Sequence, residues 1–258
     1  MLSSAALREA LGAPGGFWHD VRVVAETGST NADLLAEAKS GLAEGAVLVA
    51  DAQSAGRGRL GRRWVSPPGT SLSFSVLLRP AAVPPASRAW VPLLAGVAVA
   101  TALRGAAAAD AWLKWPNDVL VRGGKVAGIL AEQAGDAIVV GIGINVTVAR
   151  NELPVPEATS LAIEGAGTGR EPLLTGVLGQ LERWYLDWKG EAGDPDRCGL
   201  RAGYLGLCAT VGQQVCVSLP GGSVVTGEAS DVDRAGRLVV RSAAGLVPVS
   251  AGDVVHVR

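Results

Sequence analysis

The sequence predicts an α+β protein, in which a mixed β-sheet packed with helices is followed by a small all-β domain. Helix and strand patterns intermix over the first 205 residues, whereas from residue 206 short alternating strands are separated by Gly and Asp turns. The chain has 258 residues and a hydrophobic content of 48%, which is ample for a buried core. We therefore expect two domains, at residues 1–205 and 206–258.

The N-terminal half supplies the first strands of the sheet and two helices. The strand over 71–78 alternates serine with apolar residues, which predicts one buried face. The elements in order are a helix over 4–11 that ends in the Gly- and Pro-rich residues 12–16, a strand over 21–24, a helix over 32–40, and strands over 47–50 and 71–78.

The remainder of the first domain adds two core helices and more strands. A helix over 91–103 packs on the sheet, and a helix over 171–189 carries an apolar stripe of Leu174, Val177, Leu178, Leu181, Trp184 and Trp188. Between them we expect paired strands over 111–121, a strand over 125–132 entered through a Gly123-Gly124 turn, a strand over 137–146, and a Pro-, Gly- and Ala-rich connection over 151–169.

The last part of the chain predicts an all-β unit of the size of a small barrel. Its strands are expected at 214–219, 224–230, 237–241, 246–250 and 254–257. This segment carries no cluster of chemically active residues, so we expect it to shape a site without supplying chemistry.

Composition and charge exclude several classes of function. The apolar run at 90–103 is too short to span a bilayer, and no export signal marks the N-terminus, so we expect a cytoplasmic protein with no membrane partner. A net charge of −1 argues against a nucleic-acid partner. Three cysteines without metal-ligand spacing are typical of reduced thiols, and the two isolated histidines predict no protein-bound metal.

Two residue types that the composition avoids gather in a few short motifs. The chain has 4 lysines against 19 arginines, and only 4 asparagines. Lys114 and Lys125, with Asn31, Asn117 and Asn145, all fall inside the motifs described below. Their concentration there favours a chemical role.

The segment 56–64, called here the arginine loop, reads Gly-Arg-Gly-Arg-Leu-Gly-Arg-Arg-Trp. Glycines let backbone N–H groups approach an anion, and guanidinium groups bind phosphate or carboxylate oxygens in pairs. The loop therefore indicates an anion-binding site, with a solvated basic turn as the alternative. It also contains G-x-G-x-x-G, but no helix opens within it and Arg79-Pro80 stands where a dinucleotide fold needs an acidic residue.

Three polar residues, Ser29-Thr30-Asn31, precede the helix over 32–40. Ser29 or Thr30 suits the N-cap, and Asp33 in the first turn favours the helix dipole. One cap needs only one such residue. The three either serve as a cap alone or also form the polar end of a pocket.

Five motifs follow one another along the first domain. They are Gly28-Ser29-Thr30-Asn31, the stretch 53–64 that begins at Gln53 and contains the arginine loop, Lys114-Trp115-Pro116-Asn117-Asp118, Lys125-Val126-Ala127-Gly128-Ile129-Leu130 and Gly141-Ile142-Gly143-Ile144-Asn145. In this order and at these separations they resemble the motifs of biotin protein ligases, which biotinylate the carrier domain of biotin-dependent carboxylases. The resemblance implies the biotin/lipoate ligase fold, similar to class II synthetases, for the first domain and an SH3-like barrel for the second.

The resemblance implies a two-step reaction. Biotin and ATP form biotinyl-5′-AMP with loss of pyrophosphate, and a lysine of a biotin carboxyl carrier protein or domain then takes the biotinyl group. Biotin and ATP are expected as substrates, with Mg²⁺ on the phosphates. Because two anions must be held together despite their repulsion, the positive charges of Arg57, Arg59 and Lys125 fit this chemistry.

The same resemblance assigns roles to individual residues. Catalytic roles are implied for Arg57, Arg59, Lys125 and Asp118. The biotin-binding set is Ser29, Thr30, Asn31, Gln53, Arg57, Gly58, Arg59, Lys125, Gly128, Gly141 and Gly143. The set for ATP and the adenylate is Arg57, Arg59, Trp64, Lys114, Asn117, Lys125 and Asn145.

Two of these residues keep alternative interpretations. Trp64 is either a stacking surface for adenine or a core tryptophan. Asp118 either orients Mg²⁺ or the acceptor amine, or is a turn residue after Asn117. Because Arg57 and Arg59 have no carboxylate nearby in sequence, we expect the arginine loop to be mobile without ligand and to close over it.

One departure from part of the family concerns the N-terminus. Members that also repress transcription carry a winged helix-turn-helix domain before the first motif, and here 27 residues precede Gly28. This resembles the monofunctional class, so we expect no repressor function. Two alternatives stay open: a lipoate or octanoate ligase of the same superfamily, and a non-catalytic nucleotide-binding module.

Overall fold

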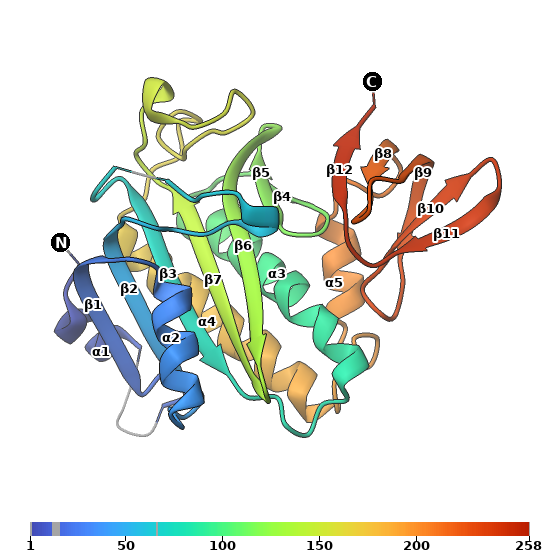
Figure 1. Ribbon diagram of the computed structural model, residues 1–258. Helices are drawn as coiled ribbons and strands as arrows, with labels where there is room; N and C mark the ends of the chain where they lie inside the picture. Colours follow the sequence, from blue (N-terminus) through green and yellow to red (C-terminus); the bar gives the residue numbers. More distant parts are fainter. Residues whose placement is uncertain (1, 12–15, 66, 258) are drawn as a thin grey trace.

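The computed structural model describes residues 2–11, 16–65 and 67–257 (Figure 1). The first domain is built on a seven-stranded sheet with helices on both faces, and the second on a five-stranded sheet. The predicted α+β class is therefore confirmed. The expected end of the first helix at 12–15 lies outside the described residues.

The first sheet has the strand order β1-β2-β3-β7-β6-β5-β4. β1 and β2 are parallel, whereas every other neighbouring pair is antiparallel. The sheet is therefore mixed, as predicted. Its strands are β1 (Asp20–Thr27), β2 (Ala46–Gln53), β3 (Ser71–Leu78), β4 (Ala111–Lys114), β5 (Asp118–Val121), β6 (Gly124–Ala134) and β7 (Ala137–Asn145).

Helices cover both faces of this sheet (Figure 1). On one face α3 (Trp90–Ala106) and α4 (Arg170–Gly190) pack against each other, and α2 (Thr30–Lys39) lies on the other face over β3 and β7. α1 (Ser4–Ala10) contacts β1, and α5 (Leu200–Leu207) contacts α3. Short 3₁₀ turns occupy Arg59–Gly61, Pro85–Ala89 and Arg150–Glu152.

α3 is the central element of the core. With the 3₁₀ turn before it, the segment Pro85–Ala106 is long and apolar enough to cross a membrane by length and composition, but 67% of its most apolar window is buried inside the protein. Packing against α4 and the sheet accounts for this apolar character. α4 buries the predicted stripe with two differences, because Leu173 and Tyr185 join it and Trp184 is only partly buried.

β3 corrects one prediction. All eight of its residues are buried, so both faces of the strand are covered instead of one. Leu72, Phe74, Val76 and Leu78 join the main core. On the other face Leu77 joins a smaller apolar cluster with α2, and Ser75 hydrogen-bonds to side chains at the start of α2. The alternating pattern identified the two faces correctly but could not show that a helix covers the serine face.

The second domain is an antiparallel sheet with the order β11-β10-β9-β8-β12. Within the described residues, the edge strands β11 and β12 are not paired with each other, so the expected barrel takes the form of an open sheet. Helix α5 ends at Leu207 and therefore crosses the expected boundary at 205/206. The strands are β8 (Gln214–Ser218), β9 (Val224–Val232), β10 (Leu238–Ser242), β11 (Gly245–Val249) and β12 (Asp253–His256).

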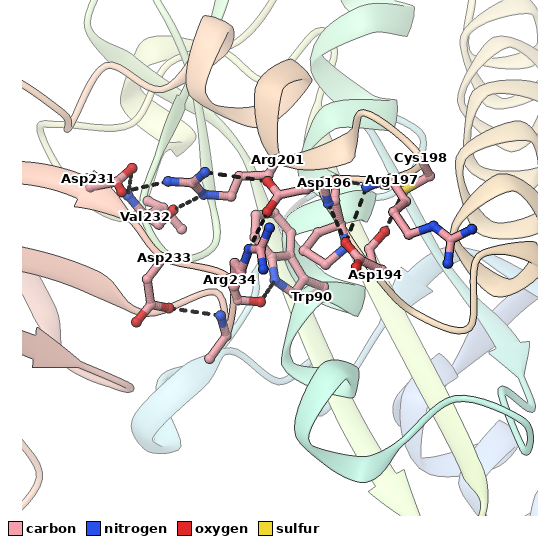
Figure 2. Close-up of polar contacts among 12 residues, drawn as sticks. Trp90, Asp194, Asp196, Arg197, Cys198, Arg201, Asp231, Val232, Asp233 and Arg234 are labelled. Carbon is pink, nitrogen blue, oxygen red and sulfur yellow. Dashed lines mark hydrogen bonds and ion pairs between the residues drawn. The ribbon is translucent and has the colours of Figure 1, made fainter.

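Polar contacts fasten the second sheet to the first domain (Figure 2). Arg201 on α5 donates to the carbonyl oxygen of Val232 (2.7 Å) and to Asp231 Oδ2 (2.6 Å), both on β9. Arg234, in the turn after β9, donates to Asp196 Oδ2 (2.6 Å) in the connection before α5. Charge-assisted bonds of this kind are stronger than neutral ones, so they fix the angle between the two sheets.

Two buried indoles extend this junction toward the functional motifs. Trp90 Nε1 on α3 donates to the carbonyl oxygen of Arg234 (2.7 Å), and Trp115 Nε1 donates to that of Gly236 (3.1 Å). Gly236 has a left-handed φ of 76°, which a residue with a side chain rarely adopts. The turn between β9 and β10 therefore contacts the Lys114–Asn117 segment directly, through Trp115.

Replacing Arg201 with alanine is expected to lower the free energy of unfolding by about 2 kcal/mol, because it removes two charge-assisted hydrogen bonds across the junction. Urea unfolding measures this change. Arg197 provides a control, since its side chain is 71% exposed and pairs only with Glu191 in the described part of the chain. Arg197→Ala should change the unfolding free energy by less than about 0.5 kcal/mol. Equal effects of both changes would contradict the assignment of the junction to Arg201.

Candidate active site

Two cavities lie against the arginine loop. One has a volume of ≈ 810 Å³ and reaches from the start of α2 to β12, and the other, of ≈ 980 Å³, lies between the loop, α3 and the β9–β10 turn. Both are of the size typical for small-molecule sites. Trp115, Pro116 and Asn117 line both cavities.

The cavity of ≈ 810 Å³ brings together the predicted site residues from all five motifs. Thr30 alone among them does not line it; it is 3% exposed and lies behind the cavity wall. The residues that do line it are Ser29, Asn31, Gln53, Arg57, Gly58, Arg59, Trp64, Lys114, Asn117, Asp118, Lys125, Gly128, Gly141, Gly143 and Asn145.

The arginine loop is held by side chains far away in the sequence. Arg57 Nη2 lies 3.0 Å from Glu132 Oε2 on β6, and Arg59 Nη1 donates to Asn117 Oδ1 (2.7 Å). Arg62 pairs with Asp253 on β12 of the second domain. Arg57, which has no carboxylate nearby in sequence, therefore gains one in space, whereas Arg59 pairs with a neutral amide oxygen. Mobility of the loop stays a prediction.

Arg59 is a desolvated cation at the centre of the site. Burial lowers the pKa of its guanidinium below the ordinary value, while the negative charges of Asp253 and Asp118 act in the opposite direction. Within the described residues, its side chain donates one hydrogen bond, to the neutral oxygen of Asn117. An anionic ligand would therefore supply the charge partner that Arg59 lacks.

Lys125 and Asp118 form an ion pair on the cavity wall. Lys125 Nζ lies 2.6 Å from Asp118 Oδ1, and both side chains are largely buried. Asp118 is the first residue of β5 and lies in register with Gly128 of β6. It is thus a strand residue with a cationic partner, which replaces the interpretation as a simple turn residue.

The floor of the cavity is formed by glycines that a tryptophan covers. A Cβ atom on Gly143 would lie 2.3 Å from the Trp64 ring, and one on Gly128 would lie 3.3 Å from it. The indole therefore rests on bare backbone of β6 and β7 and lines the cavity. Trp64 Nε1 is buried and has no hydrogen-bond partner in the described residues, so it is available to a ligand.

The polar end of the cavity lies at the start of α2. Ser29 is the N-cap and accepts a hydrogen bond from the Ala32 backbone N–H (3.4 Å), as one of the two alternatives predicts. Asn31 is 4% exposed, and a Cβ atom on Gly141 would lie 2.3 Å from its Oδ1. Ser29 caps the helix, Asn31 braces the fold, and both line the cavity, which favours the interpretation that the motif is more than a cap.

Asn145 is more closely tied to the fold than predicted. Its Nδ2 donates to the carbonyl oxygen of Thr159 (2.9 Å), and its Oδ1 accepts from Ser71 Oγ (3.5 Å). One donor and one acceptor site of its amide are thereby used inside the protein. Its side chain supports the segment that follows Ala158, which forms another part of the cavity wall.

Several cavity residues were missed by sequence reasoning. Glu132 and Asp253 pair with the arginine loop but belong to no motif. The connection over 151–169 also contributes, since Lys125 N–H donates to Glu157 O (2.8 Å) and Thr159 N–H donates to Lys125 O (2.8 Å). The sequence carries no local signal for these contacts.

The fold and the cavity agree with the class of biotin and lipoate ligases. A family model described as "Biotin/lipoate A/B protein ligase family" matches residues 23–148, and one described as "Biotin protein ligase C terminal domain" matches residues 210–257. These two segments correspond to the motif-bearing sheet and to the second sheet.

Individual relatives make the assignment more specific. The chain is 45% identical over 262 residues to a biotin–[acetyl-CoA-carboxylase] ligase of Mycobacterium tuberculosis, covering 100% of this chain and 96% of that protein. It is 35% identical to the ligase of the same name from Paracoccus denitrificans, covering 90% and 98%. A biotin protein ligase of Aquifex aeolicus in complex with biotin and ATP has a TM-score of 0.76 and 30% identity, covering 93% and 99%.

The chain belongs to the biotin protein ligase family. It is therefore an enzyme that ligates biotin to protein.

Proposed function

We propose that the enzyme activates biotin as biotinyl-5′-AMP and then transfers the biotinyl group to one lysine of a biotin carboxyl carrier domain of an acyl-CoA carboxylase. The carboxylate oxygen of biotin attacks the α-phosphorus of ATP, and the bond to pyrophosphate breaks. The carrier amine then attacks the acyl carbon, AMP leaves, and the amine loses a proton. The observation that supports this best is one cavity that combines a polar end, a glycine floor and the cations Arg57, Arg59 and Lys125.

The cavity suggests how the substrates are arranged. Ser29, Asn31 and Gln53 lie at the end proposed for biotin, and Trp64 is proposed to face the adenine. Arg57, Arg59 and Lys125 lie between these ends, where the carboxylate and the α-phosphate must meet. Preorganised cations at this position stabilise the negative charge that builds up in the transition state.

Mg²⁺ is proposed to enter as the complex with ATP. No group of three or more His, Cys, Asp or Glu side chains that could hold a metal is found in the described part of the chain. The cavity carboxylates Glu132 and Asp253 pair with arginines, and Asp118 pairs with Lys125. Because each of these carboxylates already pairs with a cationic side chain, they fit a Mg²⁺ ion that is held mainly by the phosphates of ATP. Asp118 is the carboxylate that pairs with Lys125.

The second domain is proposed to shape the entrance used by ATP or the carrier. Asp253, Val254 and Val255 of β12 line the cavity, and Asp253 pairs with Arg62 of the arginine loop.

A cytoplasmic location is also proposed, since it supplies ATP and a reducing environment. The free state of Cys198, Cys208 and Cys216 agrees with such an environment.

Labelled ATP, biotin and an apo carrier domain test the proposal directly. We expect pyrophosphate release that requires biotin, followed by AMP release and biotin on a single carrier lysine. Replacing biotin with lipoate or octanoate should abolish the reaction. A preference for lipoate or octanoate, or nucleotide binding without pyrophosphate release, would instead support one of the two alternatives.

A further inference from the structure

A chain of hydrogen bonds runs beneath the cavity floor from the proposed biotin end toward the arginine loop. Thr30 N–H donates to Gln53 Oε1 (2.9 Å), and Thr30 Oγ1 lies 2.7 Å from Ser75 Oγ. Ser75 Oγ in turn donates to Asn31 Oδ1 (2.6 Å). Ser75 is 0% exposed, so this part of the chain is shielded from water.

The chain continues to the loop through a carboxylate. Asn31 Nδ2 donates to Glu132 Oε2 (2.8 Å), the same oxygen that lies 3.0 Å from Arg57 Nη2. Asn31 Nδ2 also donates to the carbonyl oxygen of Leu130 (3.1 Å), which fixes the orientation of the amide. Glu132 is thus held by Asn31 at the start of α2 and pairs with Arg57 in the arginine loop.

Asn31 sets the direction of the bond nearest to the carboxylate. Its carbonyl oxygen cannot donate, so Ser75 Oγ donates its single proton to Asn31 Oδ1. Thr30 Oγ1 lies within hydrogen-bond distance of both Ser75 Oγ (2.7 Å) and Gln53 Oε1 (3.2 Å), and its single proton can go to either oxygen. The bonds from Ser75 through Asn31 therefore orient the Glu132 carboxylate.

Arg57 keeps most of its donors free. In the described residues, Nη2 contacts Glu132, while Nε and Nη1 have no hydrogen bond or ion pair. A guanidinium group carries five N–H donors in a rigid plane, so fixing one arm also sets the direction of the others. Arg57 lines both cavities, and the free donors are available to an anionic ligand there.

We propose that Glu132 is a positioning residue for the Arg57 guanidinium, and that Ser75, acting through Asn31, orients the Glu132 carboxylate. The inference rests on the proposed function, in which Arg57 contacts the reacting anions. A guanidinium that is oriented before the substrates bind needs no reorganisation during adenylation. If Glu132 instead competed with the ligand for Arg57, removal of the Glu132 carboxylate would tighten nucleotide binding.

Three variants test this inference in single-turnover pyrophosphate release. Glu132→Gln should lower kcat about tenfold with little change in KM, as loss of an orienting outer partner does elsewhere. Ser75→Ala should lower kcat about threefold, because it removes the buried hydrogen bond to Asn31 together with the contact to Thr30. Ser73→Ala is the matched control, because Ser73 lies on the same face of β3, is 4% exposed and makes no side-chain hydrogen bond in the described residues, so it should resemble the parent.

A double-mutant cycle separates positioning from a structural role. In an Arg57→Ala background, Glu132→Gln should cause no further loss, because no guanidinium is left to orient. Additive losses, tighter nucleotide binding by Glu132→Gln, or a Ser73→Ala variant as defective as Ser75→Ala would overturn the inference. If Ser75→Ala fails to fold, the cycle at Glu132 decides alone. A parent without biotin-dependent pyrophosphate release would contradict the proposed function, whereas an active parent matched by Glu132→Gln would contradict only this inference.

Discussion

Replacing Lys125 with alanine is expected to slow pyrophosphate release by about 10²-fold or more, the range found on losing one preorganised charge or donor. The Lys125 backbone is hydrogen-bonded to Glu157 and Thr159, and the ion pair with Asp118 holds its ammonium group. The change also leaves the largely buried Asp118 carboxylate without its partner at 2.6 Å. That unpaired negative charge would repel the phosphates of ATP.

Single-turnover adenylation with biotin and ATP measures this effect. Lys39→Ala is the control, because it removes the same charge from the last turn of α2, at an exposed position outside the cavity of ≈ 810 Å³. Lys125→Arg keeps the charge but delivers it as a planar fork, so partial activity is expected. An unchanged adenylation rate in Lys125→Ala would remove this residue from the proposed mechanism.

Replacing Gly143 with alanine is expected to lower kcat/KM for adenylate formation by about 10²-fold, because a shift of about 1 Å in a substrate-positioning group can cost that much. The new Cβ would lie 2.3 Å from the Trp64 ring, a distance that forces the indole to move. The indole is a rigid group, so it cannot yield by a small rotation of a flexible end.

Gly128→Ala is the matched comparison on the neighbouring strand. Its Cβ would lie 3.3 Å from Trp64 and 3.4 Å from the Lys125 side chain, which requires a shift of only a few tenths of an ångström. We expect a loss within about threefold, as for a contact that costs less than ~1 kcal/mol. Thermal unfolding of both variants controls for folding. Equal activities of Gly143→Ala and Gly128→Ala would mean that the Trp64 ring does not rest on Gly143 in the working enzyme.

Much of the fold could be predicted because its signals are local. Periodic apolar spacing identified α2, α3 and α4 and every strand of the two sheets to within a few residues. The five motifs likewise identified about two thirds of the residues that line the cavity of ≈ 810 Å³, while most of the others come from the connection over 151–169 and from the second domain. The ends of elements, and the helices that cover a strand, were harder to predict. The serine face of β3 is buried, and α5 extends across the expected domain boundary.

The sequence by itself determined the chemical types available to this enzyme: a loop rich in arginine and glycine, two scarce lysines in motifs, and glycines spaced along β7. Only the tertiary structure decided which of these groups face one another. Arg62 pairs with Asp253, which lies 191 positions further along the chain. Arg57 pairs with Glu132 on β6 of the first sheet. Local periodicity specifies which face of a strand or helix is apolar, but the partner of a charged side chain depends on how separate elements are packed together.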